Sequence, residues 1–471
     1  MGTEVSHSGM LQEISRIISA PGSPYVKLDV VIHCGGNDIV PRQVLRWDIG
    51  RDYPKAYMDS ASVVVTLGAG TLMTLIAPFQ DDIKLTINIT PLNEEGKPIT
   101  SEKVESHTYR AYLADDVPKT LDQHSNPSMQ SQEVGDLTQL KDVAFALEEV
   151  AIEQLRKMAV GTIPRFATPF SVMKTFFVRA KEQLRLGQDV MITDVDMVEP
   201  NNTTPRDHIV LRDGTPLLDL PDILQNEQGG IYSTCLGFYI QDRKIYAWPL
   251  YDFNRIKTAR RVLQIFLSPT RQAIMIDRTW EDHGREVAIF SAGISKVIDD
   301  SQGDLNRHGN AVRFTDAGKL LDNFGTVKGN KLVVNRGEQN SEFATTVMGN
   351  GQNYAKLADN KVTSNVYLEA SKIARRAGAL MVVPWQRSKP SLLTPGMAVE
   401  LFYDYKGQVR SIEGTLIGSY SSYQMEGQGP IARAYRCGTS IIVFVDRSDP
   451  DYVAYMQAGG TISPNPEIGP F

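Results

Sequence analysis

The sequence predicts an α+β protein of several domains, because strand-rich blocks at both ends flank a middle block that contains most of the helical patterns. The chain has 471 residues, which is more than one hydrophobic core usually organises. The predicted domains are an N-terminal arm at 1–24, a β domain at 25–115, a linker with a long amphipathic helix at 116–165, a mixed helix and hairpin domain at 166–270, a second β domain at 271–446 with loop and helix insertions, and an extended tail at 447–471.

The N-terminal block combines a short helix with several strands. Apolar residues at Leu11, Ile14 and Ile17 have helical spacing. Apolar and polar residues then alternate as in strands, with a turn at 35–38. The expected strands are 26–32, 62–67, 83–89 and 109–113. Short strands separated by turns favour a small barrel or sandwich.

Two helices are expected next. A polar loop at 115–135 leads into apolar residues that recur at steps of three or four from Leu137 to Met158, with Asp136 placed to cap the start and Gly161 the end. The second helix lies between Thr168-Pro169 and Gly187, where Thr168 suits the N-cap and Pro169 the first helical position.

The rest of the chain is again dominated by strand patterns. We expect a short helix at 217–229, a hairpin of 235–240 with 244–249, and a helix at 364–377. Loops rich in Gly, Asn and Asp are expected at 299–312 and 325–352, and the last 25 residues carry four prolines. Further strands are expected at 273–277, 286–290, 398–405, 411–420 and 439–445.

The composition favours a folded protein made in a reducing cytoplasm. The net charge of −6 gives no basic footprint for specific nucleic-acid binding. Cys34, Cys235 and Cys437 lie far apart, so neither a disulfide framework nor a metal motif is expected. We expect no signal peptide and no membrane span.

Motifs for catalysis or cofactors are weak throughout, and no catalytic, cofactor-binding or metal-binding residue is predicted. Gly68-Ala69-Gly70 lacks the third glycine of a dinucleotide fingerprint and favours a turn. The seven histidines are scattered, and the polar run 281–286 is expected to be a solvated turn. No phosphate loop or nucleophile elbow occurs.

Three local features leave alternatives open. Asp194 and Asp196 present two carboxylates on one face of a strand, which is the residue type that glycoside hydrolysis uses. The aromatic run 246–251 fits either core packing or sugar binding. A basic cluster is expected to make salt-bridged subunit contacts; it contains Arg255, Lys257, Arg260 and Arg261.

Three passages resemble the baseplate hub proteins of contractile-tailed bacteriophages. The block 44–51 before the strands 62–67 and 83–89 is similar to the start of the first tail-tube-like barrel. The passages 166–170, 221–224 and 238–246 resemble the middle domain of the hub, and 393–401 with 413–418 resembles a strand pair of hub and spike-adjacent domains. The resemblance is one of element order over most of residues 25–450.

The resemblance implies two tail-tube-like antiparallel β-barrel domains around a mixed middle region. It further implies a homotrimer whose six barrels form a pseudo-hexameric ring between the tail tube and the central spike. The implied partners are the central spike protein, the tail tube and tape-measure proteins and other baseplate proteins, in a virion tail assembled in the host cytoplasm. A receptor- or carbohydrate-binding tail module that uses Trp248, Tyr251, Tyr420 and Tyr423 is the alternative, followed by a cell-wall hydrolase.

Overall fold

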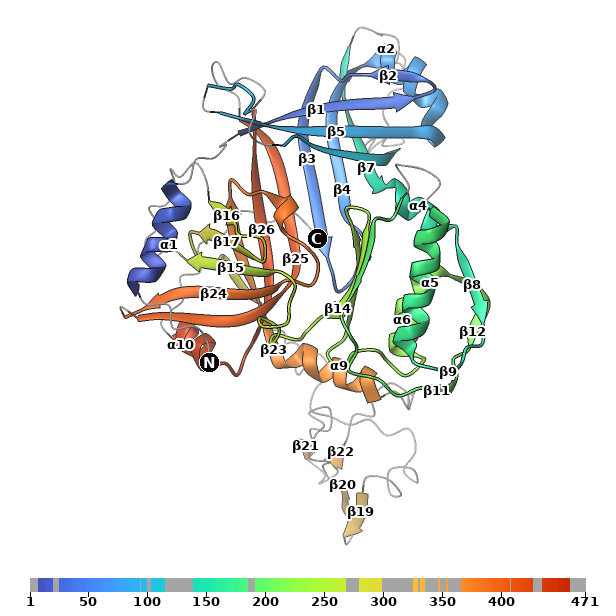
Figure 1. Ribbon diagram of the computed structural model, residues 1–471, viewed down its shortest axis with the longest axis vertical. Coiled ribbons are helices and arrows are strands. Elements are labelled where there is room, and N and C mark those ends of the chain that lie inside the picture. Colours follow the sequence, from blue (N-terminus) through green and yellow to red (C-terminus); the bar gives the residue numbers. More distant parts are fainter. Residues whose placement is uncertain are drawn as a thin grey trace.

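The computed structural model describes residues 7–19, 25–93, 95–99, 103–114, 139–184, 191–267, 279–298, 325–328, 331–334, 346–347, 353–354, 366–406, 408–426 and 434–457. It is an α+β protein in which a large mixed sheet dominates and helices lie at its periphery (Figure 1). This confirms the predicted α+β class. None of the described helices combines the length and apolar character needed to cross a membrane.

The N-terminal block supplies six strands of the large sheet and the short strand β2 (Asn37–Ile39), which pairs with β1. Buried and exposed residues alternate along most of them, so one face of each strand lines a shared core. Leu28 of β1 lies opposite Ile89 of β5, for example. The six strands are β1 (Tyr25–Cys34), β3 (Gln43–Asp52), β4 (Ser60–Gly68), β5 (Ile83–Leu92), β6 (Glu105–Leu113) and β7 (Leu140–Glu149).

The prediction of one long helix over 137–158 is wrong. Residues 140–149 form β7, which pairs with both β4 and β6, and only α4 (Val150–Arg156) is helical. Val143, Phe145 and Leu147 alternate into the core, whereas Leu140 is half exposed at 50%. The helical spacing uses Leu140, Ala144 and Leu147, whereas the strand buries Val143, Phe145 and Leu147, so the segment is apolar enough for both periods. The pairing with two neighbouring strands favours the strand.

The C-terminal block forms the other part of the large sheet around a second core. Its strands are β15 (Val262–Leu267), β16 (Trp280–Asp282), β17 (Glu286–Ser291), β18 (Lys296–Ile298), β23 (Gly378–Gln386), β24 (Ala398–Tyr405), β25 (Gln408–Glu426) and β26 (Ala434–Asp446). The predicted strands 286–290, 398–405, 411–420 and 439–445 are confirmed, and the predicted strand 273–277 lies outside the described residues.

Two long strands join the two blocks. The first half of β25 pairs with β24 and the second half with β3, while β26 pairs with β25 along its length and with β23 and β1. The change of partner in β25 coincides with a bulge between Leu416 and Gly418. A bulge adds local bend and twist, which lets one strand serve two differently oriented parts of a sheet.

The middle block carries helices and short sheets. The predicted cap is confirmed, because the Thr168 hydroxyl accepts a hydrogen bond from the Ser171 N–H at 3.1 Å, and Pro169 begins α5 (Pro169–Gln183). The predicted short helix is observed as η4 (Leu217–Asp219) and α6 (Leu220–Asn226). Two short pairs, β8 (Ala159–Thr162) with β12 (Leu211–Pro216) and β9 (Arg165–Ala167) with β11 (Arg206–His208), flank the helices (Figure 1).

The predicted hairpin is confirmed as β13 (Leu236–Gln241) and β14 (Lys244–Pro249). Asp242 and Arg243 at its turn have φ of 51° and 61°, the left-handed conformation of a two-residue hairpin turn. β14 also pairs in parallel with β10 (Asp194–Met197), which completes a three-stranded sheet.

The remaining helices cover the flanks of the sheet. The predicted N-terminal helix is α1 (His7–Ser19), whose Met10, Ile14 and Ile17 pack on aromatic residues of the second block. The helix predicted at 364–377 is α9 (Val366–Ala377) and ends before Gly378 as expected. Between β4 and β5, the segment 69–82 forms three short helical turns, α2 (Ala69–Thr71), η1 (Leu72–Ile76) and η2 (Ala77–Asp82).

One loop prediction needs correction. Within 325–352 the structure places β19 (Gly325–Lys328) against β20 (Lys331–Val334), and β21 (Thr346–Val347) pairs with β22 (Asn353–Tyr354). The loop was expected from the average composition of this stretch, which conceals the short runs at 325–328 and 331–334 that contain Val and Leu. The predicted loops 115–135 and 299–312 lie outside the described residues.

The tail after 446 is not extended throughout, since α10 (Pro450–Gln457) is a helix. Asp449 accepts a hydrogen bond from the Asp451 N–H at 2.7 Å, and Pro450 occupies the first helical position, where its missing N–H has no cost. Pro450, one of the four prolines in the predicted extended tail, is therefore the first residue of a helix.

Candidate functional site

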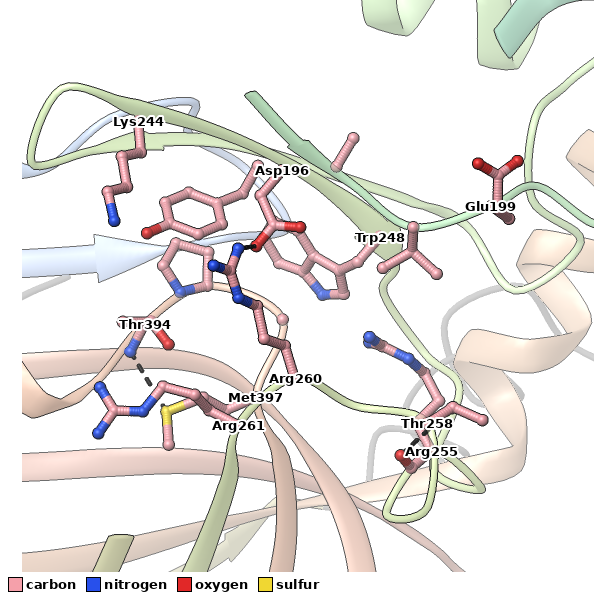
Figure 2. A pocket seen from close by; sticks show the side chains of 15 residues that line it. Asp196, Glu199, Lys244, Trp248, Arg255, Thr258, Arg260, Arg261, Thr394 and Met397 are labelled. Carbon is pink, nitrogen blue, oxygen red and sulfur yellow. Dashed lines mark hydrogen bonds and ion pairs between the residues drawn. The ribbon is translucent and has the colours of Figure 1, made fainter. Parts of the chain in front are cut away.

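A cavity of about 440 Å³ lies between β14 and two loops that precede strands of the second block (Figure 2). We call it the Arg255 pocket. β10 and β14 supply one wall, the loop 255–261 before β15 a second and the loop 394–397 before β24 a third. The parallel pairing of β10 with β14 brings Asp196 beside Tyr246, and the two loops complete the cavity from segments farther along the chain.

One side of the pocket is closed by an ion pair. Nη1 of Arg260 lies 2.7 Å from Oδ2 of Asp196 and 3.9 Å from Asp194. The hydrogen bond to Asp196 raises the pKa of Arg260. Asp194 and Asp196, the carboxylates that the sequence singles out for hydrolysis, are thus engaged by an arginine from the basic cluster.

Three of the four residues of the basic cluster line the pocket. Arg255, Arg260 and Arg261 line the cavity, whereas Lys257 does not. Arg261 donates to Asp282 at 2.9 Å. Arg260 and Arg261 thus form salt bridges within the chain, whereas the prediction was of salt bridges between subunits.

Arg255 differs from Arg260 and Arg261 because its side chain forms no ion pair with a described residue, although the carboxylates of Asp252 and Asp196 act on it from a longer distance. Arg255 is 5% exposed, and its Nη1 forms no hydrogen bond with any residue that the structure describes. Burial lowers the pKa of Arg255. The backbone carbonyl of Arg255 accepts from the N–H groups of Thr258 at 3.0 Å and Ala259 at 2.7 Å, which fixes the loop.

Trp248 lines the same cavity with a second unsatisfied donor. It is 1% exposed, and its Nε1 has no hydrogen-bond acceptor among the described residues. Figure 2 shows the Arg255 and Trp248 side chains pointing into the space between the walls. The arrangement can bind an acceptor group with one cation and one neutral donor.

The aromatic residues considered for sugar binding are mostly internal. Trp248, Tyr251 and Tyr423 are buried, and Tyr420 is half-buried. Trp248 packs edge-on against Tyr53 at 5.4 Å, and Tyr423 stacks on Trp47 at 4.8 Å. These rings pack in cores and form no exposed aromatic platform.

The polar run 281–286 forms the exposed turn between β16 and β17, as predicted, and it also holds α1. Arg16 donates to Glu281 at 2.9 Å and contacts His283. The ligand atoms of Glu13, Glu281 and His283 lie within 4.8 Å of one another. The Arg16 guanidinium lies among these groups, so their negative charge is used for helix docking and the set is a poor cation site.

A second polar cluster, which the sequence did not indicate, lies where the hairpin turn meets the N-terminal block. The carboxylate of Glu149 accepts from the N–H of Asp242 at 2.7 Å and of Arg243 at 3.1 Å. Burial, with Asp242 and Asp59 nearby, raises the pKa of Glu149 to about 7. His107 and Tyr109 line the adjoining cavity of about 310 Å³. No local motif signals this cluster, because its members come from three distant segments.

Solved structures of tail proteins are similar to this chain. A tail protein of Neisseria meningitidis MC58 matches at 12% identity and a TM-score of 0.40, over 89% of this chain and 96% of that one. The 43 kDa tail protein of prophage MuSo2 from Shewanella oneidensis matches at 9% identity and a TM-score of 0.41, over 88% and 98%.

A third similar structure is the E. coli c3393 protein, which is described as a component of the type VI secretion system with structural similarity to the T4 tail proteins gp27 and gp5. It matches at 9% identity and a TM-score of 0.38, over 89% of this chain and 77% of that one. No family model matches the sequence. No curated protein matches it either.

Proposed function

We propose that this chain is a non-enzymatic structural protein of a virion tail and acts as the baseplate hub of a contractile tail. In this role three copies form a ring that joins the tail tube to the central spike, with tape-measure and other baseplate proteins as neighbours. The observation that carries the proposal is that β25 and β26 belong to two successive sets of strands at once.

The first set forms a closed circuit of pairings. From β25 the partners run through β3, β4, β7, β6, β5 and β1 to β26, which pairs again with β25. One core lies within this circuit and contains residues of every strand in it. We assign this circuit to the first tail-tube-like barrel that the sequence resemblance implies.

The second set shares the same two long strands. From β25 the partners on one side are β24, β15, β17 and β16, and from β26 on the other side they are β23 and β18. The Ser291 hydroxyl at the end of β17 donates to the Pro384 carbonyl of β23 at 2.7 Å, which brings the two arms together. We assign this set to the second tube-like unit.

Two fused units per chain suit a symmetry adaptor. Three copies of such a chain offer six similar docking positions, so a trimer matches the six-fold symmetry of a tail tube on one side and a three-fold spike on the other. Among the described strands, β16 and β18 lie at the two ends of the pairing path, and we propose them as the positions where a neighbour adds a strand.

The test is the assembly state of the purified full-length chain. Size-exclusion chromatography with light scattering is expected to give three times the mass of the chain, and class averages from electron microscopy are expected to show three-fold rings with six peripheral densities and a central hole. A protein that stays monomeric at all concentrations, alone and together with the spike protein of the same tail, contradicts the proposal. Dimers or open filaments contradict it equally, because neither closes with three-fold symmetry.

A further inference from the structure

We propose that the Arg255 pocket is a binding site for a carboxylate, in which the Arg255 guanidinium and the Trp248 indole N–H bind the two carboxylate oxygens. This site is independent of the ring assembly proposed above. The carboxylate is that of a glutamate or aspartate in a peptide segment, or that of a small organic acid.

The first argument is the cost of leaving Arg255 without a partner. A buried guanidinium loses the hydration of its charge, and this loss is normally offset by a paired carboxylate or by several carbonyl acceptors. Within the described chain Nη1 of Arg255 has no acceptor, and the carboxylates of Asp252 and Asp196 act on Arg255 only from beyond ion-pair distance. The loop nevertheless holds Arg255 in place through the carbonyl of residue 255. An anion from outside supplies the missing partner.

The second argument is the fixed direction of the Trp248 donor. A Cβ at Gly237 would approach Cε2 of Trp248 to 2.5 Å, and a Cβ at Gly396 would approach Cγ to 3.1 Å. The indole therefore lies between two close backbone segments, and Tyr53 meets its edge from a third direction. The Trp248 N–H is therefore held in one orientation and has no acceptor among the described residues, so it can donate to a ligand without rearrangement.

The third argument is the balance of charge in the pocket. Arg260 and Arg261 are paired with Asp196 and Asp282, which leaves Arg255 as the buried cation without an ion-pair partner in the described wall. Lys244 is a further cation of the lining, and with the three arginines it outweighs the carboxylates of Asp196 and Glu199, so the cavity as a whole favours an anion. A monoanion with a planar acceptor group fits the flat guanidinium better than a phosphate does.

The fourth argument is the apolar part of the wall. Val198, Pro395 and Met397 line the cavity beside the ring of Trp248. These side chains can contact the methylene groups that join a carboxylate to its backbone, which a bare inorganic anion lacks. The pocket therefore combines one orienting cation, one orienting donor and an apolar surface.

The experiment measures binding to the full-length chain by calorimetry at constant ionic strength. Three probes are used: N-acetyl-glutamate amide for a peptide carboxylate, acetate for a small organic acid and inorganic phosphate for the competing anion class. Arg255→Gln is expected to weaken binding of the carboxylates by about tenfold or more, because a charge-assisted pair is lost. Trp248→Phe keeps the ring but removes the donor and is expected to weaken binding about threefold to tenfold.

Arg212→Gln is the matched control, because Arg212 is exposed on β12 and does not line the pocket. Arg255→Lys keeps the charge without the planar fork and is expected to bind with intermediate affinity. Tighter binding of N-acetyl-glutamate amide than of acetate assigns the site to a peptide segment, and equal binding assigns it to a small acid. The proposal is overturned if neither carboxylate binds, if phosphate binds more tightly, or if Trp248→Phe and a folded Arg255→Gln bind as well as the parent chain.

Discussion

Arg51 and Asp59 form an ion pair inside the protein, with Nε of Arg51 at 3.2 Å from both carboxylate oxygens. The Tyr239 hydroxyl donates to the same carboxylate at 3.0 Å, and Arg51 also donates to the Pro390 carbonyl at 2.9 Å. Burial raises the pKa of Asp59, and Arg51 opposes this shift. One residue pair thus connects the N-terminal block, the hairpin of the middle block and the loop before β24.

Replacement of Arg51 by Met is expected to lower the free energy of unfolding by about 3–5 kcal/mol, because it leaves the Asp59 carboxylate without its cation in a buried site. Urea denaturation measures the change. Lys97→Met removes one partner of the exposed pair Lys97–Glu95 and is the control, with an expected change within about 0.5 kcal/mol. Equal effects of the two substitutions contradict the role assigned to the buried pair.

Glu149 is expected to make stability depend on pH near neutrality. Its pKa is about 7 in the folded chain against an ordinary value of 4.5, so the folded state keeps a proton that the unfolded state releases. The stabilisation is complete below pH 4.5 and is lost as the pH rises through 7. The free energy of unfolding of the parent chain, measured by urea denaturation between these limits, should fall by about 1–3 kcal/mol in total.

Glu149→Gln cannot titrate and should flatten that part of the profile. It also lowers the plateau, because an amide offers one acceptor oxygen where the carboxylate accepts from the N–H groups of Asp242 and Arg243 through two. Glu153→Gln, which disrupts an exposed pair with Lys157 on α4, is the control and should retain the slope of the parent. If the free energy of unfolding of the parent chain does not change with pH in this range, the role assigned to Glu149 is wrong.

Gly418 is expected to be intolerant of any side chain. It lies at the bulge where β25 changes partner, and a Cβ there would approach the Arg51 carbonyl oxygen to 2.6 Å. Gly418→Ala should therefore cost about 1–3 kcal/mol by displacing β3 from β25. Gly438→Ala in β26 is the matched control, because a Cβ there meets no atom within 4 Å. Thermal unfolding of the two variants distinguishes a specific close approach from a general intolerance of alanine in these strands.

The sequence predicts an element correctly where the interactions that stabilise the element are local. The cap of Thr168 and the hairpin with its turn at Asp242 depend on neighbours within a few residues, and both were predicted with nearly the right bounds. The prediction of a helix over 137–158 was wrong because the conformation of β7 depends on its pairing with β4 and β6. Both of these strands lie outside the window in which helical spacing is read. The same holds for α10, where the cap of Asp449 outweighs the expectation that proline ends regular structure.

The candidate site was predictable only as separate parts. Asp196, Trp248 and the basic cluster were each singled out by residue type, but their convergence depends on the parallel pairing of β10 with β14. The free donors of Arg255 and Trp248 follow from burial in the folded chain, which no spacing reveals. Arg51, Asp59 and Tyr239 had no signal at all, since up to 188 positions separate them along the chain.

The last prediction concerns the attachment of α1 to the second block. Ile17 is fully buried, and α1 packs on Phe266, Phe290 and Phe402, of which Phe266 and Phe402 stack at 4.9 Å. Ile17→Ala should remove about 2–5 kcal/mol of packing, which exceeds what the exposed pair of Arg16 with Glu281 can supply. The helix is then expected to detach without loss of the sheet.

Hydrogen exchange measures this outcome directly, as faster exchange of the α1 amides with unchanged protection of β15 and β24. Gln12→Ala on the exposed face of α1 is the control and should leave protection as it is. If Ile17→Ala instead accelerates exchange across β15, β17 and β24 together, α1 is an integral part of that core, because the helix and the sheet then unfold as one cooperative unit.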